Sequence, residues 1–247
     1  MEWKVVPLCA KQLLDVDPMD VLFGGDFRKC DVYKSGGGYD QFPKLCENIL
    51  GLKGYNLQFV VQLQGCVLEC PYCYVTKEGI FGKCKKYSDW DLVSFFNSTP
   101  CNIFHLMGGA PAIYIEKWPH ILEALNKYSK KEYVFYSDLL LVEKPYTKDI
   151  LERIKSDRAL YAISIKGYGE GFYTNTKREL DIDLFWYNLT AIEKSGINYY
   201  ITFTNVNDEE YLAFWEDFRT KLGLNTTYKR IRQSLNIDLI KYNAIDN

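Results

Sequence analysis

Three cysteines lie close together in one short segment. Cys66, Cys70 and Cys73 are spaced C-x3-C-x2-C within GCVLECPYC, which begins at Gly65. Thiolates on one loop can wrap a compact iron–sulfur cluster, and a [4Fe-4S] cube normally takes four such ligands. Three local ligands would leave one iron without a protein partner, and an open coordination position is where a metal centre does chemistry. The segment therefore predicts a [4Fe-4S] cluster with one reactive iron.

The same thiols allow a different metal site. C-x2-C pairs are common in zinc modules, and Cys84 could complete a structural zinc site with the three cysteines. Zinc modules usually bring two separated pairs, which favours the cluster. Cysteines outside the segment are scattered, so we interpret them as buried small hydrophobic residues and not as ligands of a second cluster. They are Cys9, Cys30, Cys46, Cys84 and Cys101.

The cysteine segment resembles the signature of the radical S-adenosylmethionine (radical SAM) superfamily, including an aromatic residue, Tyr72, directly before the last cysteine. In that family the unique iron is chelated by the amino and carboxylate groups of SAM. The reduced cluster then breaks the sulfonium bond and yields a 5'-deoxyadenosyl radical. The resemblance covers residues 55–247 and implies the same two cofactors, a [4Fe-4S] cluster and SAM, for this chain.

A glycine turn extends the resemblance. Met107-Gly108-Gly109-Ala110-Pro111 is similar to the family's GGEP turn, whose backbone approaches the methionine amine of SAM. Glycines permit such close backbone contact. Ala110 stands where the family has glutamate, so one acceptor for the SAM ammonium group is lost. Asp138 or a backbone carbonyl is the expected replacement.

Further SAM contacts are implied at the ends of later strands. Relatives have a Thr-Asn pair where this chain has Ser137-Asp138, and an S-x-K motif is matched by Ser164 and Lys166. Asn205 lies where another polar contact is expected. The segment 239–243 resembles L-L-P-Y-H of pyruvate formate-lyase activating enzyme, with Asn243 in place of the usual His. The nearest subgroup by these motifs is the small activating-enzyme type.

The elements that must position these residues follow a regular alternation from about residue 57. Short apolar runs rich in β-branched and aromatic residues predict six strands, and stretches with helical spacing lie between them. The runs are 57–64, 102–107, 133–138, 160–166, 198–205 and 236–242. Helix caps are expected at Ser88, Thr147, Asp183 and Asn207. Parallel strands joined by helical crossovers predict an α/β fold, an open (partial) (β/α)6 TIM-like barrel.

The predicted motifs and the predicted topology agree. All the candidate residues fall at or beyond the carboxyl ends of the strands, where barrels and open α/β sheets place their sites. Residues 1–50 do not join the alternation and contain Gly24-Gly25 and Gly36-Gly37-Gly38. No GK[ST] follows these glycines, so a flexible or capping N-terminal extension is favoured over a phosphate loop. Residues 51–247 are the predicted radical SAM domain.

Composition limits the partners. The chain has 247 residues, a formal charge of -2 and 47% hydrophobic residues, which suffice for one sizeable core. Without a basic field, nucleic acid is a weak candidate. No apolar run is long enough to span a membrane, and the N-terminus lacks the layout of a secretory signal, so the expected compartment is the cytoplasm.

The sequence therefore predicts a radical SAM enzyme that needs a low-potential electron donor of the flavodoxin or ferredoxin type. Abstraction of a hydrogen atom from a glycine of a partner enzyme is the first hypothesis. The alternatives are radical modification of a peptide, a small molecule or RNA, and a non-catalytic zinc-binding interaction module. No motif identifies the substrate.

Overall fold

The computed structural model describes residues 1–6, 28–29, 42–73 and 80–223. Its centre is one twisted mixed sheet in the order β4-β1-β3-β5-β6-β7-β8, with β2 pairing with β3. The parallel part consists of β3 (Leu57–Leu63), β5 (Ile103–Gly108), β6 (Val134–Leu139), β7 (Ala159–Ile165) and β8 (Tyr199–Phe203). Five of the six predicted strands are thus confirmed. The sixth, 236–242, lies outside the described residues, as does Asn243.

Short antiparallel strands extend the sheet at its other edge. Strand β1 (Glu2–Val5) pairs with β4 (Lys85–Ser88) and, through Val5, with β3. Strand β2 (Arg28–Lys29) also pairs with β3. The first 50 residues therefore contribute strands to the sheet, and they also contribute α2 (Phe42–Leu45) and the π-helix η2 (Cys46–Leu50). The division of the chain at residue 50 stays a prediction.

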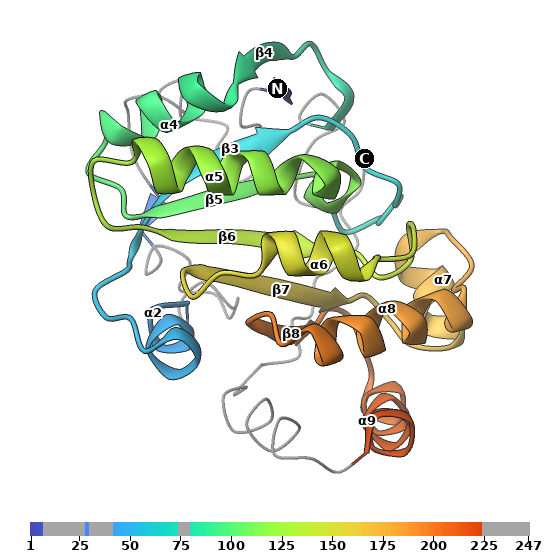
Figure 1. Ribbon diagram of the computed structural model, residues 1–247. Helices are drawn as coiled ribbons and strands as arrows, with labels where there is room; N and C mark the ends of the chain where they lie inside the picture. The colour runs from blue at the N-terminus through green and yellow to red at the C-terminus, as the bar shows by residue number, and fades with distance from the viewer. Residues whose placement is uncertain (7–27, 30–41, 74–79, 224–247) are drawn as a thin grey trace.

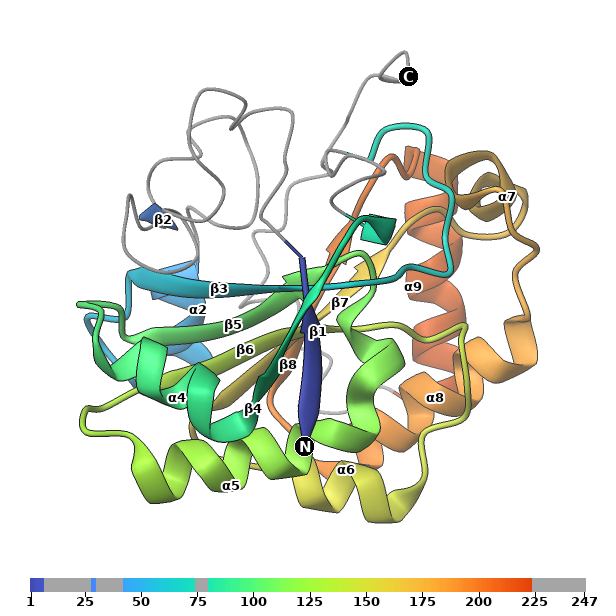
Figure 2. The ribbon, with the colours of Figure 1, turned by 90° about the horizontal axis from the view of Figure 1, so that it is seen from above.

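Helices cover one face of the sheet, as Figures 1 and 2 show for α4, α5, α6 and α8. The helices after β4 are α4 (Asp89–Asn97), the 3-10 helix η3 (Pro111–Lys117), α5 (Trp118–Tyr128), α6 (Lys148–Ile154), α7 (Glu170–Thr176), α8 (Ile182–Ser195) and α9 (Asp208–Leu222). None of these helices is long and apolar enough to cross a membrane, a finding limited to the described part of the chain.

Local sequence sets most of the helix starts. Ser88 accepts a hydrogen bond from the Asp91 amide and Asp91 bonds back to the Ser88 amide, which makes a capping box at α4. Thr147 and Asn207 cap α6 and α9 as predicted. The expected cap at Asp183 is wrong, because the Asp181 side chain accepts from the Leu184 amide and α8 starts at Ile182.

Two apolar cores lie on opposite faces of the sheet. The larger core fills the space between the sheet and the helices, where Trp118 of α5 stacks on Tyr161 of β7 with 5.7 Å between ring centroids. The smaller core lies on the other face, near the amino ends of the strands, and packs against α2 and η2. Its buried members are Leu45, Cys46, Tyr55, Ile103, Val134, Tyr136, Leu160, Ala162 and Tyr200. We call this group the lower core.

The described strands do not close on themselves. The sheet ends at β4 on one side and at β8 on the other within the residues that the structure places. Together with the parallel βα order, this confirms the predicted α/β fold, an open partial TIM-like barrel. The carboxyl ends of the parallel strands lie at one rim, which is the rim that the candidate site residues occupy.

Candidate functional site

The cysteine loop, residues 65–73, begins directly after β3 at the rim of the sheet. Gly65 starts the loop at φ +103°, a conformation that glycine adopts readily, and its amide donates to the Ile80 carbonyl over 2.7 Å. The Leu68 amide donates to Cys66 Sγ over 3.4 Å, and the Cys73 amide donates to the Cys70 carbonyl over 3.0 Å. These bonds fold the loop on itself, and all three thiols remain partly exposed.

The glycine turn packs directly against this loop. A Cβ at Gly109 would lie 2.3 Å from the Gly65 carbonyl oxygen and 2.6 Å from Cys66 Cβ, so only glycine fits. Gly108 has φ +135°, and its Cβ would meet Leu63 backbone atoms. The Ala110 amide donates to the Gly65 carbonyl over 3.0 Å. The glycine pair therefore holds the end of β5 against the first cysteine, which is a role that the family resemblance did not imply.

Lys166, at the end of β7, faces the same loop. Its Nζ lies 6.0 Å from the centre of the Tyr72 ring, within reach of a cation–π contact. Its charge also acts on Cys66, on Cys70 and on Asp138. A single cation thus connects the cysteine loop with the end of β6.

Partial burial raises the pKa values of two of the thiols. Burial raises the pKa of the Cys66 thiol to about 11; the neighbouring Cys70 and Cys73 raise it too, whereas the Leu68 amide and Lys166 lower it. Burial also raises the pKa of Cys70, and Lys166 opposes that shift. The thiols influence one another because they are close. Metal binding here must displace protons, since the thiolate is the ligand form.

These donors fit an iron–sulfur cluster. Three soft sulfur ligands converge on one loop at a partly exposed rim, with a cation beside them to offset thiolate charge. Within the described ranges no group of three His, Cys, Asp or Glu side chains is arranged to hold a single metal ion, and this holds for the three loop cysteines too. Cys84 lies near Tyr114, whose hydroxyl donates to the carbonyl of Gln64, the residue that precedes the cysteine loop.

Of the predicted Ser137-Asp138 pair, only the aspartate faces the site. Burial raises the pKa of Asp138 to about 6, while the Lys166 cation lowers it. Ser137 alternates with Asp138 along β6 and is fully buried, and its hydroxyl donates to the Leu106 carbonyl over 3.1 Å. Its side chain therefore belongs to the helix-covered face, and the structure does not bring it to the other site residues.

The remaining predicted contacts lie at the ends of the next strands. The Ser164 and Thr204 hydroxyls are 3.4 Å apart, so they join the ends of β7 and β8. Asn205 has φ +53°, and its carbonyl accepts from Asn175 Nδ2 over 2.9 Å. Both residues are placed at the expected rim. Arg178 was not predicted as a site residue, because it belongs to no sequence motif. It follows α7 and donates to the Val67 carbonyl in the cysteine loop.

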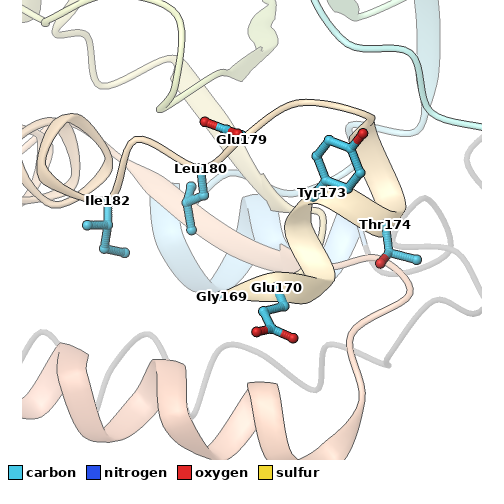
Figure 3. A pocket seen from close by; sticks show the side chains of 7 residues that line it. All are labelled: Gly169, Glu170, Tyr173, Thr174, Glu179, Leu180 and Ile182. Carbon is cyan, nitrogen blue, oxygen red and sulfur yellow. The ribbon is translucent and has the colours of Figure 1, made fainter.

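An open groove of about 640 Å³ lies beside α7 (Figure 3). Glu170, Tyr173 and Thr174 line it from α7, and the segment leading into α8 supplies the other side chains, Glu179, Leu180 and Ile182. None of the predicted site residues lines this groove. The groove is therefore separate from the cysteine loop.

Comparison with known proteins agrees with this fold. No known family profile and no curated sequence matches the chain. The crystal structure of Streptococcus suis SuiB is similar with a TM-score of 0.53 and 14% identity, over 85% of this chain and 45% of SuiB. The structure of anSMEcpe with bound AdoMet and Cp18Cys peptide gives a TM-score of 0.49 and 13% identity, over 72% of this chain and 48% of anSMEcpe.

A spore photoproduct lyase mutant with dinucleoside spore photoproduct gives a TM-score of 0.45 and 13% identity, over 71% of this chain and 60% of that one. The similarity to SuiB shows that the chain shares the fold of that protein. The chain spans less than half the length of SuiB and of anSMEcpe.

Proposed function

We propose that this chain is a radical SAM enzyme whose cluster ligands are Cys66, Cys70 and Cys73. The observation that carries the proposal is that the three thiols, Lys166 and the glycine turn meet at the carboxyl rim of a partial barrel. The superfamily fold supports it. When bound, the [4Fe-4S] cluster and SAM would supply reductive cleavage of the sulfonium bond and a 5'-deoxyadenosyl radical.

The chain's own residues hold charge and exclude water at this rim. Lys166 places a cation near Cys66 and Cys70, which favours their thiolate forms when metal replaces the protons. Tyr72 is buried and lies beside Cys70. A water-poor surrounding limits side reactions of a radical.

Asp138 is the proposed acceptor for the SAM ammonium group. Ala110 has no acceptor side chain, and Asp138 is the carboxylate that Lys166 connects electrostatically with the cysteine loop. Gly108 and Gly109 pack against Leu63, Gly65 and Cys66, and this packing holds the turn beside the first cysteine, where the family resemblance expects the SAM amine. Ser164 and Asn205 complete the proposed SAM contacts at the ends of β7 and β8.

Anaerobic reconstitution with iron and sulfide tests the proposal. We expect a brown protein with absorption near 400 nm and about four iron atoms per chain, as a [4Fe-4S] cluster requires. Addition of dithionite and SAM should give 5'-deoxyadenosine, measured by mass spectrometry. Cys70→Ala should lose both the absorption and the product. A colourless wild-type protein that binds zinc and forms no 5'-deoxyadenosine would contradict the proposal.

Cys84→Ala is the matched control. Cys84 is partly exposed like the loop cysteines, but it lies near Tyr114. The cluster proposal expects Cys84→Ala to keep its iron and its product. If the site instead binds zinc, Cys84→Ala should lose its metal just as Cys70→Ala does.

For the substrate we propose hydrogen abstraction from a glycine of a partner protein, with electrons from a flavodoxin- or ferredoxin-like donor. The sequence motifs that resemble the small activating-enzyme type support this hypothesis. The test fractionates a cell extract by dialysis and measures which fraction stimulates 5'-deoxyadenosine formation. A stimulating fraction that the membrane retains, with a new glycyl radical signal in electron paramagnetic resonance (EPR), is expected. Stimulation by the dialysable fraction alone would favour a small-molecule substrate.

A further inference from the structure

The C-terminal end of α7 contacts the cysteine loop at two backbone positions. The Glu69 amide donates to the Thr176 carbonyl over 3.0 Å, and Arg178 Nη1 donates to the Val67 carbonyl over 3.1 Å. Both acceptor and donor sites in the loop lie between Cys66 and Cys70. Figure 2 shows the segment after β3 running toward α7. We call residues 175–178 the α7 clasp.

The same clasp reaches two other loops at this rim. Arg178 Nη1 lies 3.6 Å from Glu143 Oε2, in the loop after β6. Asn175 Nδ2 donates to the Asn205 carbonyl at the end of β8 over 2.9 Å. One short segment thus links the cysteine loop to the ends of β6 and β8, both of which carry proposed SAM contacts.

The clasp is itself held firmly. Thr176 is fully buried, and its hydroxyl donates to the Phe172 carbonyl over 2.7 Å. The turn before α7 is tight, since a Cβ at Gly167 would lie 2.5 Å from the Gly171 backbone. This turn follows Lys166 directly, so α7 is fixed to the end of β7 as well.

We propose that the α7 clasp holds the cysteine loop in its cluster-binding conformation, with Arg178 as the positioning residue. The proposal rests on the proposed function, because it assigns how the ligand loop of that site is held. Arginine suits the role because its planar guanidinium can serve a carbonyl and a carboxylate together, whereas the lysine ammonium is a point charge. Hydrogen bonds from a charged donor are stronger than neutral ones, so loss of this contact should loosen Val67 and its neighbours.

The first test uses the metal-free chain and is independent of any cofactor. Arg178→Met removes the charge but keeps an apolar stem, and Arg153→Met is the matched control. Arg153 forms a surface ion pair with Asp149 on α6, away from the loop. For Arg178→Met we expect about tenfold faster amide hydrogen exchange at Leu68 and Glu69, with unchanged thermal unfolding, as loss of a charge-assisted bond implies. Arg153→Met should leave these amides unchanged.

Glu143→Gln is a milder second variant that keeps Arg178 and its bond to Val67. It should accelerate the same amides by a smaller factor, about two- to threefold, because an ion pair of this exposure contributes little. This variant keeps the proposal testable if Arg178→Met fails to fold. Unchanged exchange at Leu68 and Glu69 in both variants would overturn the clasp.

The second test uses the reconstituted protein and a readout that a general loss of stability does not move. The midpoint potential and EPR line shape of the cluster should change in Arg178→Met and stay as in wild type in Arg153→Met. If wild-type protein binds no iron, the proposed function fails, and the exchange experiment still decides the clasp. If wild type binds the cluster but Arg178→Met matches it in exchange, potential and line shape, the clasp fails and the proposed function stands.

Discussion

The two ends of the parallel strands differ sharply on the face opposite the helices. At the amino end, the lower core is buried, and polar side chains in it and beside it bond to one another. His105 Nδ1 lies 2.7 Å from Gln58 Oε1, and the Tyr136 and Tyr200 hydroxyls are 2.6 Å apart. At the carboxyl end, three partly exposed thiols lie on one loop, and the Lys166 cation acts on two of them, Cys66 and Cys70.

Strand β7 alone shows the same change from buried apolar residues to partly exposed polar ones. Along β7, buried Leu160 and Ala162 give way to partly exposed Ser164 and then to Lys166 just beyond the strand. The amino end is packed as a core, whereas the carboxyl end carries the residues of the proposed site. Because parallel strands bring all their carboxyl ends to one rim, each strand adds its last residues to one site. Substitutions at the amino end should therefore lower the free energy of unfolding, whereas substitutions at the carboxyl end should lower cluster and SAM binding.

The largest expected effect comes from removing a thiol at the carboxyl end. Cys70→Ala should abolish cluster binding and 5'-deoxyadenosine formation, whereas Cys46→Ala in the lower core should keep both. Cys46 is fully buried and packs as a small hydrophobic residue. Absorption near 400 nm and iron content measure the difference. Equal loss of iron in the two variants would break the distinction between the two ends.

A truncation in the lower core should act on stability alone. Leu160 is completely buried, so Leu160→Ala should lower the free energy of unfolding by about 3 kcal/mol, in the range for buried leucine truncations. Lys166→Met at the other end of β7 should change it by less than about 1 kcal/mol, as most partly exposed substitutions do. Urea unfolding of the metal-free chain provides both values. A larger loss for Lys166→Met than for Leu160→Ala would reverse the comparison.

Titration of Asp138 should appear in the affinity for SAM. Burial raises the pKa of this carboxyl to about 6, and only the ionised form accepts from an ammonium group. Between pH 7 and pH 5 the ionised fraction of this carboxyl falls about tenfold, so the affinity of the holoprotein for SAM should fall by the same factor. Asp138→Asn should bind SAM weakly at both pH values. Equal affinity and equal pH dependence in wild type and variant would exclude this role.

The same carboxyl gives a stability readout without any cofactor. Its pKa in the folded chain lies above the value of the unfolded chain, so the folded state binds the proton more tightly. This contribution is present at low pH and is lost as the pH rises through about 6. The difference in unfolding free energy between wild type and Asp138→Asn should therefore shift in favour of the variant over that window. Parallel stability curves would contradict the raised pKa.

A small effect is expected for the hydroxyl pair of the lower core. Tyr136→Phe removes the bond to Tyr200 and should cost about 1 kcal/mol of unfolding free energy, the usual net value of one hydrogen bond. The Tyr136 ring remains to fill its place, so iron content and SAM cleavage should match wild type. A selective loss of SAM cleavage in this variant would extend the functional region into the lower core.

The sequence predicted the elements whose signals are local. Strand runs such as 160–166 agree with β7 within a residue at each end, and the cap at Ser88 follows from its spacing to Asp91. The start of α8 was wrong because Asp181 and Asp183 carry the same capping chemistry two residues apart. Side-chain alternation along β6 separates Ser137 from Asp138, although the sequence motif treats them as a pair.

The sequence by itself determined the cysteine loop, the glycine turn and the parallel strands, since thiol spacing, missing side chains and apolar runs act over a few residues. Only the tertiary structure decided that β1 joins the sheet, that Lys166 faces both Asp138 and the thiols, and that Arg178 holds Val67. Residues 67 and 178 are 111 positions apart, and no local pattern records such a contact. Contacts of this kind arise when packing brings distant loops to one rim, so their energy depends on the whole fold and not on neighbouring residues.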